Sequence, residues 1–188
     1  MQEEMKSFFE KRTKQHINRV IKNSYILCDE FLDLKEGLLE QVMKHDESKF
    51  NEPEYSPYLH ITWKYKCISD GSTYDPPEDM SARMHEATVH HVLNNPHHPE
   101  YWVEGFNEDS LSSEDHDGIP DKIVDGRTMN RVSIAEMCCD WVSMSQEKDG
   151  SSSAHNWAKK NINKRWKFTD EQVEWIYEFI DHLSLKGD

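Results

Sequence analysis

Apolar residues recur at helical spacing along most of the chain. Over residues 3–31 they follow this spacing with no proline or glycine between them, which predicts one long helix. A second helix is expected over residues 34–45 and a short aromatic one over 58–65. A third long helix is expected over 80–94, after the capping candidate Asp79. The first half of the chain is therefore predicted to be helical.

The second half of the chain opens on a polar stretch. Residues 107–131 contain two glycines and a proline, and they predict one extended surface loop or insertion. Two capping boxes follow, Ser133-Ile-Ala-Glu136 and Thr169-Asp-Glu-Gln172, and each predicts the start of a helix. We find no internal repeat and no convincing strand. The expected fold is all-α, with residues 1–188 forming a single compact helical domain.

Composition agrees with one globular domain. A chain of 188 residues can bury a core without disulfides or partner subunits. The chain is 36% hydrophobic and 31% charged, and it has six tryptophans, so a packed aromatic core is expected and disorder is excluded. The four cysteines lack C-x-x-C spacing and are expected to be reduced, mostly packed thiols.

The charge balance limits the class of partner. A formal net charge of -14 repels a phosphate backbone, so nucleic acid is not expected as the main partner. The nearest basic run, residues 159–167, is expected to be a solvated helix face. A small anionic substrate such as a nucleotide stays compatible with this charge, because a bound metal can supply local positive charge. A homo-oligomer also stays compatible with the sequence.

The sequence shows no targeting or membrane signal. Residues 1–8 are polar and charged, without the apolar core of a signal peptide. No apolar run reaches the length of about 18 residues that spans a bilayer. We therefore expect a cytoplasmic protein with no membrane partner.

Histidine and carboxylate residues gather at the expected helix ends. The dipeptide His45-Asp46 offers an imidazole nitrogen and a carboxylate oxygen, which can bind one divalent metal or span two. A second copy, His116-Asp117, lies in the polar loop and is expected to be solvated.

Two carboxylates share one face of a later helix. Glu136 and Asp140 are four residues apart, so both point to the same side. We interpret Asp140 as a metal ligand and Glu136 as a group that orients a ligating histidine.

A family resemblance gives these residues a common role. The order His16, then His45-Asp46, then Asp140 resembles the H…HD…D signature of the HD-domain superfamily, over roughly the span that these residues define. Members of the superfamily are helical and mostly hydrolyse phosphate esters with bound divalent metals, which implies that these four residues are ligands. Lys49 resembles the H-D-x-x-K version found in cyclic-dinucleotide phosphodiesterases and in mixed-valent di-iron oxygenases.

The resemblance also implies a second metal. In dinuclear members, extra histidines between the HD pair and the last aspartate supply it, and His91, His97 and His98 are the matching types. Their spacing leaves open which of them ligates. The segments 90–102 and 136–141 also look like a phage and bacterial family of unassigned function, a likeness that runs over most of the chain and implies no activity.

The leading hypothesis is a metal-dependent phosphohydrolase acting on a nucleotide or a related small phosphate ester. One or two ions of manganese, iron, cobalt, zinc or magnesium would activate a water. Asp46 would bridge the metals or help to deprotonate that water, and Lys49 would contact the substrate phosphate unless it pairs with a nearby glutamate. The alternatives are a di-iron HD-type oxygenase and a non-catalytic phage-type protein that binds and sequesters a nucleotide or a host factor.

Overall fold

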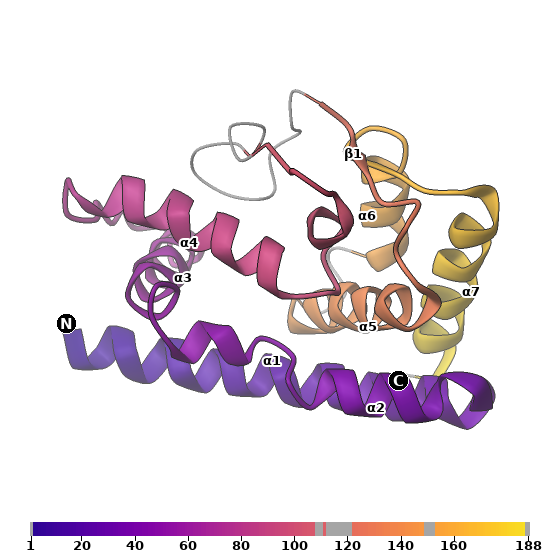
Figure 1. Cartoon of the computed structure of the whole chain (residues 1–188). Helices are drawn as coiled ribbons and strands as arrows, with labels where there is room; N and C mark the ends of the chain where they lie inside the picture. Colours follow the sequence, from indigo (N-terminus) through magenta and orange to yellow (C-terminus); the bar gives the residue numbers. More distant parts are fainter. Residues whose placement is uncertain (1, 108–110, 112–121, 149–152, 187–188) are drawn as a thin grey trace.

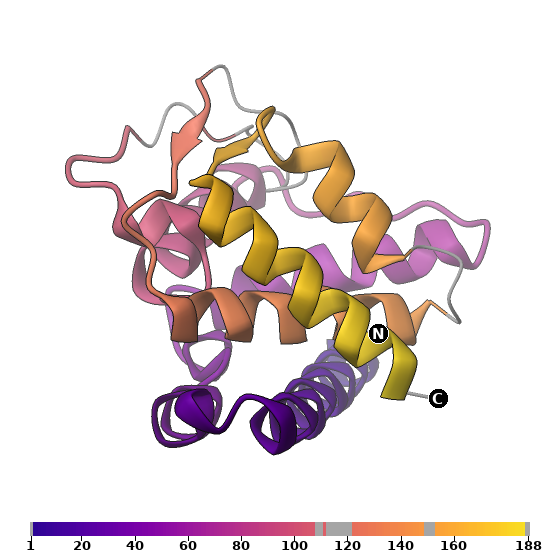
Figure 2. The ribbon, with the colours of Figure 1, turned by 90° about the vertical axis from the view of Figure 1, so that its right-hand side faces the viewer.

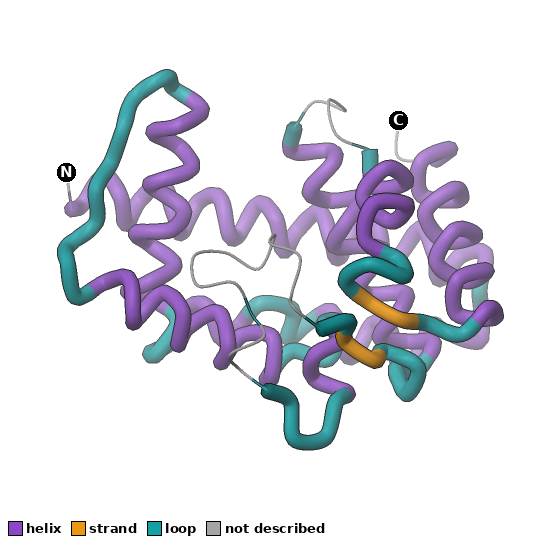
Figure 3. Tube along the Cα trace, turned by 90° about the horizontal axis from the view of Figure 1, so that it is seen from above, coloured by secondary structure: helices purple, strands orange, loops and turns teal. Residues whose placement is uncertain are grey.

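The computed structural model of the chain describes residues 2–107, 111, 122–148 and 153–186. Helix predominates in these ranges, as the purple segments of Figure 3 show. The α-helices of the described residues are α1 (Gln2–Glu30), α2 (Lys35–Val42), α3 (Tyr55–Ser69), α4 (Met80–Asn94), α5 (Arg131–Glu147), α6 (Ala154–Asn161) and α7 (Asp170–Lys186). They are joined by the 3₁₀ turns η1 (Leu32–Leu34), η2 (Glu47–Phe50) and η3 (Pro99–Trp102) and the strands β1 (Val124–Asp125) and β2 (Trp166–Lys167). The expected all-α class is confirmed.

Two long helices, α1 and α5, form the centre of the fold. In Figure 1, α1 runs along the base with α2 beside it, and α5 lies above α1. Figure 2 shows α7 crossing in front of α5, and α6 contacts both of these helices. On the other side, α3 packs on α1 and pairs with α4. The helix α1 therefore contacts elements from both halves of the chain.

The helix α5 is buried on almost every side. Residues 133–139 are all buried, so this part of the helix lies inside the core even though it includes the polar residues Ser133 and Glu136. Cys138 and Cys139 are adjacent and both fully buried, and all four cysteines of the chain are free thiols, as expected. Each fully buried Leu, Ile or Phe around α5 contributes about 1.5–3 kcal/mol, and such contacts hold α5 in place.

The buried stripe of α1 changes character midway. Met5 and Phe9 belong to one apolar cluster with residues of α3 and α4. Val20 and Leu27 belong to a larger cluster around α5 and α7. Between the two clusters the buried positions are taken by the polar residues Thr13 and His16, which are 5% and 7% exposed. A polar site is thus built into the junction between two apolar cores.

The longest helix of the described residues, α1, is too polar to cross a bilayer. It carries many charged side chains on its exposed positions. Across the described ranges of the chain, no helix combines the length and apolar character needed to cross a bilayer.

The HD pair lies in a turn, because the helix that was expected to end at His45 ends three residues earlier. The helix α2 ends at Val42, and His45 and Asp46 follow in the turn that leads to η2. Asp46 has φ +58, in the left-handed region that aspartate enters more readily than most residues. Such backbone conformations cluster at functional sites, where surrounding contacts maintain them.

One helix differs from the prediction in its bounds, and two differ in their capping. The expected helix over 58–65 begins earlier, at Tyr55, and ends later, at Ser69. The helix α4 has the expected bounds, but Asp79 makes no capping hydrogen bond. Ser133 is not a cap, because α5 begins two residues earlier and its cap is Asn130.

The second capping box is confirmed. The backbone N–H of Thr169 donates to Oε1 of Gln172 over 2.8 Å, and the backbone N–H of Gln172 donates to Oγ1 of Thr169 over 3.1 Å. The amide of Gln172 also donates to the carbonyl of Met129 over 2.8 Å. The start of α7 is therefore tied to the segment that leads into α5.

A short parallel sheet occurs where no strand was expected. β1, inside the expected loop, pairs with β2, with Val124 opposite Trp166. Strands of two residues are too short to show an alternating pattern in sequence. The basic run before β2 is not wholly solvated, because Arg165 is 2% exposed. The part of the expected loop that holds His116-Asp117 lies outside the described residues.

The cap of α5 yields a stability prediction. Oδ1 of Asn130 accepts a hydrogen bond from the backbone N–H of Ser133 over 2.9 Å. Replacing Asn130 by Ala should lower the free energy of unfolding by about 1 kcal/mol, the usual effect of losing an N-cap. Chemical denaturation measures this, with Asn130→Asp as the control that keeps the acceptor. Equal stability of the Ala and Asp variants would contradict the assignment.

Candidate metal centre

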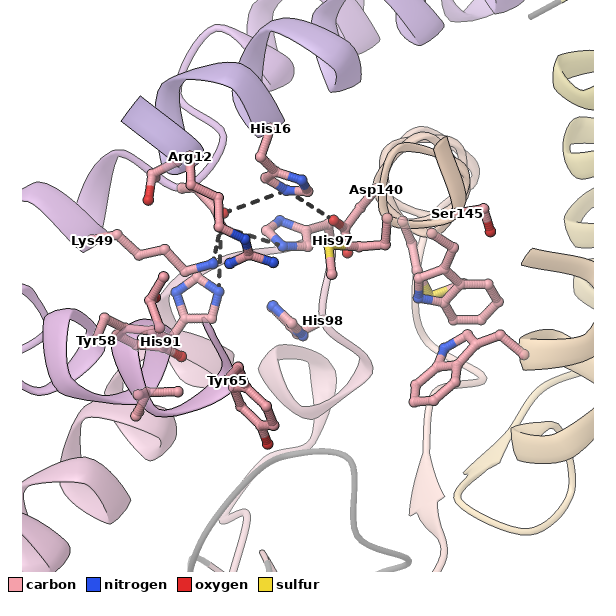
Figure 4. Close-up of a pocket in the computed structure, with 18 of the residues that line it drawn as sticks. Arg12, His16, Lys49, Tyr58, Tyr65, His91, His97, His98, Asp140 and Ser145 are labelled. Atoms are coloured by element: carbon pink, nitrogen blue, oxygen red, sulfur yellow. Dashed lines mark hydrogen bonds and ion pairs between the residues drawn. The ribbon is translucent and has the colours of Figure 1, made fainter. Parts of the chain in front are cut away.

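Histidines and carboxylates from five separate segments meet at one buried place. They come from α1, the turn after α2, α4, the loop before η3, and α5, and Figure 4 shows the labelled members pointing towards a common space. Its members are the predicted ligands and one further carboxylate: His16, His45, Asp46, His91, His97, His98, Asp140 and Glu136. The structure thus brings every sequence-predicted ligand into one region.

The first group of donors surrounds His16. Its Nε2 lies 3.0 Å from Oδ1 of Asp140 and 3.2 Å from Nε2 of His45. Oδ2 of Asp46 lies 3.6 Å from Nε2 of His16 and 3.8 Å from that of His45. Two imidazole nitrogens approach this closely when a proton or a cation lies between them. His16, His45 and Asp140 can place one donor atom each within 4.8 Å of one another, which suits a metal ion.

The second group lies on the other side of Asp46. Nε2 of His91 is 3.3 Å from Oδ1 of Asp46, and Nε2 of His97 is 3.9 Å from the same oxygen. His91, His97 and His98 also place one donor atom each within 4.8 Å of one another. The two oxygens of Asp46 therefore face different groups of histidines.

The surroundings of Asp46 fit a metal. The residue is 1% exposed, and within the described part of the chain its Oδ1 has no hydrogen-bond donor. A buried carboxylate oxygen without a partner is unfavourable, and a coordinated cation would satisfy it. A mixed set of imidazoles and carboxylates suits manganese, iron, cobalt or zinc better than magnesium, which prefers oxygen ligands.

Two buried glutamates set the orientation of the histidines. Nδ1 of His45 donates to Oε1 of Glu136 over 2.8 Å, and Nδ1 of His91 donates to Oε2 of Glu54 over 2.9 Å. With Nδ1 protonated, the lone pair of each neutral imidazole lies on Nε2, which is the atom that faces Asp46. This is the arrangement that metal-binding histidines use.

Sequence reasoning missed Glu54. Its carboxylate is fully buried and also accepts hydrogen bonds from Ser48 Oγ over 3.0 Å and His90 Nδ1 over 2.7 Å. His90 and His91 are adjacent on α4, and both contact Glu54 because each bonds a different oxygen of its carboxylate. No local motif marks a glutamate beside Pro53 as buried, so the sequence offered no usable signal.

The pKa values follow from burial and from these contacts. Burial raises the pKa of the Asp46 carboxyl, but Lys49 and then His45 outweigh it and hold the pKa well below its ordinary value. Burial opposes ionisation of Asp140 as well, and the hydrogen bond from His16 lowers its pKa. Both carboxyls are therefore charged and ready to ligate at neutral pH.

The two histidines beside Glu136 are shifted in opposite directions. Burial lowers the pKa of His45, but Asp46 and the hydrogen-bonded Glu136 outweigh it and raise the pKa to about 9. Burial, together with the positive charge of His45, lowers the pKa of His97 to about 4. Without a metal, His45 carries the positive charge that the surrounding carboxylates require.

A cavity of about 390 Å³ opens beside the donors. Lys49 lines it, and its Nζ donates to Oδ2 of Asp46 over 2.7 Å and lies 5.1 Å from the ring centre of Tyr58. Lys49 therefore pairs with Asp46 and not with a nearby glutamate. Trp141 and Trp166, whose rings stack 5.5 Å apart, line another part of the cavity.

The orienting glutamates yield a prediction about metal number. Glu136→Gln should weaken a metal held by the first group about 10- to 100-fold, and Glu54→Gln should do the same for the second group. Titration calorimetry with manganese or zinc on the metal-stripped protein would then show a different site weakened in each variant. A single binding event in the wild type, weakened in both variants, would contradict two separate metals.

The raised pKa of His45 yields a pH prediction. Because His45 is protonated below about pH 9 in the metal-free protein, a metal must displace that proton, so metal affinity should rise as pH increases from 6 to 9. Calorimetry in buffers of different ionisation enthalpy should detect release of about one proton at pH 7. His155→Gln, at an exposed histidine, is the control. Affinity that stays constant over this range would contradict the assignment.

Comparison with known proteins places the chain in a family. No curated protein matches the sequence, and no solved structure matches it. The family described as "Family of unknown function (DUF5662)" matches residues 5–182, a span that includes every candidate ligand. Because the match covers nearly the whole sequence, the chain belongs to the DUF5662 family.

Proposed function

We propose that the protein is a metal-dependent phosphohydrolase of the HD type that acts on a nucleotide or a related small phosphate ester. The buried carboxylate of Asp46 carries this proposal, since each of its oxygens faces a different group of histidines. A carboxylate so placed suits a pair of metals, and paired metals are widely used to hydrolyse phosphate esters.

The donors divide into two groups. His16, His45 and Asp140 would hold one ion, His91 with His97 or His98 would hold the other, and Asp46 would contact both. When bound, divalent ions lower the pKa of a water ligand to near 7 and neutralise charge on phosphate oxygens, an effect of about several kcal/mol.

The chain's own residues supply the remaining chemistry. Lys49 has three N–H donors, of which one bonds Asp46, so the others are available to a phosphate oxygen in the cavity. Asp46 is charged at neutral pH, because its pKa is held well below its ordinary value, so it can ligate metal and accept a hydrogen bond that orients an attacking water. The same low pKa makes it a weak general base. The tryptophans of the cavity wall provide an apolar surface for the organic part of the substrate.

A di-iron oxygenase is the second candidate. The observation that favours it is the number of imidazoles, since five histidines share the site with two aspartates and such nitrogen-rich sets bind iron well. Metal identity separates the two candidates, because an oxygenase requires iron and consumes oxygen.

The test joins metal analysis with a search for turnover. Protein purified without added metal is analysed for bound elements and then assayed for phosphate release from a panel of nucleotides with manganese, cobalt, zinc or iron. We expect metal-dependent phosphate release. Asp46→Asn should reduce its rate at least about 100-fold, because the variant lacks the carboxylate charge that would hold the metals. Each tenfold loss in rate corresponds to about 1.4 kcal/mol in the activation free energy.

The control is Asp125→Asn, at an exposed aspartate paired with Arg127, which should retain activity. Oxygen consumption with iron, without phosphate release, would contradict the phosphohydrolase and support the oxygenase. Nucleotide binding without turnover, with each of the metals tested, would contradict both enzymes and support a protein that sequesters a nucleotide.

A further inference from the structure

A cationic side chain that sequence reasoning did not single out points into the cavity. Arg12 lies four residues before His16 on α1, so the two side chains leave the helix on the same face. Both line the cavity, and Figure 4 shows Arg12 and Lys49 directed towards the space around the histidines. Arg12 and Lys49 come from different segments of the chain, which places two cations near the candidate metals.

Arg12 is held in place by a carboxylate of α5. Its Nε donates to Oε1 of Glu147 over 2.6 Å, and its Nη2 donates to Oε2 over 3.2 Å. The side chains of Arg12 and Glu147 are 35% and 24% exposed, and ion pairs at such exposure contribute little stability. The main consequence of this pair is therefore the position of the guanidinium.

The ion pair with Glu147 uses one edge of the Arg12 guanidinium. Glu147 occupies Nε and one hydrogen of Nη2, whereas the hydrogens of Nη1 are not directed at Glu147. Arginine can bond two oxygens at once through adjacent N–H groups, which is why it recognises phosphate well. A held arginine with a second edge available suits an oxyanion in the cavity.

The charges that line the cavity differ from those of the whole chain. Its carboxylates are Asp46 and Asp140, both of them candidate metal ligands, and Arg12 and Lys49 are among its cations. The whole chain carries a formal net charge of -14. Local cations and bound metals would attract an anion that the rest of the surface repels.

We propose that Arg12 and Lys49 form a subsite for the phosphoryl group of the substrate, with Glu147 as the positioning residue that aims Arg12. The subsite rests on the proposed function, since it assigns the residues that bind the group to be hydrolysed. Arg12 binds the anion directly, whereas Glu147 acts through Arg12.

Arg19 provides a matched control. Its Nη2 donates to the same Oε2 of Glu147 over 3.2 Å, but Arg19 does not line the cavity. Arg19→Gln therefore removes an ion pair of similar exposure with the same partner and leaves the proposed subsite intact.

The experiment measures binding of inorganic phosphate to the metal-loaded protein by calorimetry, together with metal content, melting temperature and kinetics. Arg12→Gln should weaken phosphate binding and raise KM about 10- to 100-fold, as expected for loss of a charge-assisted hydrogen bond, with metal content unchanged. Glu147→Gln should raise KM less and leave kcat unchanged, and Glu147→Asp should recover part of the loss. Arg19→Gln should match the wild type.

Each outcome decides for or against the subsite. Phosphate binding and KM that are unchanged in Arg12→Gln would overturn it, even if the wild type hydrolyses phosphate esters. An equal effect of Arg19→Gln and Arg12→Gln would also overturn it, because the cause would then be a lost ion pair. Phosphate binding that weakens in Arg12→Gln supports the subsite even if no ester is hydrolysed, in which case the proposed function fails alone.

Discussion

Asp46 is a charged carboxylate at a place from which water is almost entirely excluded. Burial of such a group is costly unless cations or donors surround it, and this requirement dictates much of the neighbouring structure. Lys49 bonds one of its oxygens, and histidines approach both oxygens from two sides. Four segments, α1, the turn and η2 after α2, α4, and the loop before η3, must come together to supply these partners. The junction between the two apolar clusters is therefore also the place where the chemistry is concentrated.

The charge of Asp46 is balanced in layers. Of the histidines that face it, His45 and His91 are held by Glu136 and Glu54, and these glutamates are in turn hydrogen-bonded by neutral or cationic groups. His45 and His91 each have one nitrogen committed to a glutamate and the other directed inward, whereas Nδ1 of His16 lies 2.8 Å from Oγ of Ser143. The result is a set of donors fixed before any ligand arrives, and this preorganisation favours tight metal binding.

The cavity continues from this arrangement and is lined by further cationic side chains. Acidic residues outnumber basic residues in the chain, with 36 against 22. The carboxylates that line the cavity, however, are the two aspartates beside the histidines. Lys49 and Arg12 are each tied to a carboxylate and still retain N–H groups for a ligand. A small anion can be recognised at such a site, whereas an extended polyanion would meet the repulsive outer surface.

The sequence by itself determined the helical class and the bounds of α4, because helical periodicity and the proline after Asn95 are local signals. The capping box at Thr169 was readable for the same reason. A family resemblance, together with residue types, indicated the candidate ligands between His16 and Asp140. The tertiary structure alone decided that Asp46 adopts a left-handed conformation in a turn, that Glu54 is buried against two histidines, and that Arg12 faces the cavity. These features depend on contacts between segments far apart in the chain, and no local pattern encodes such contacts.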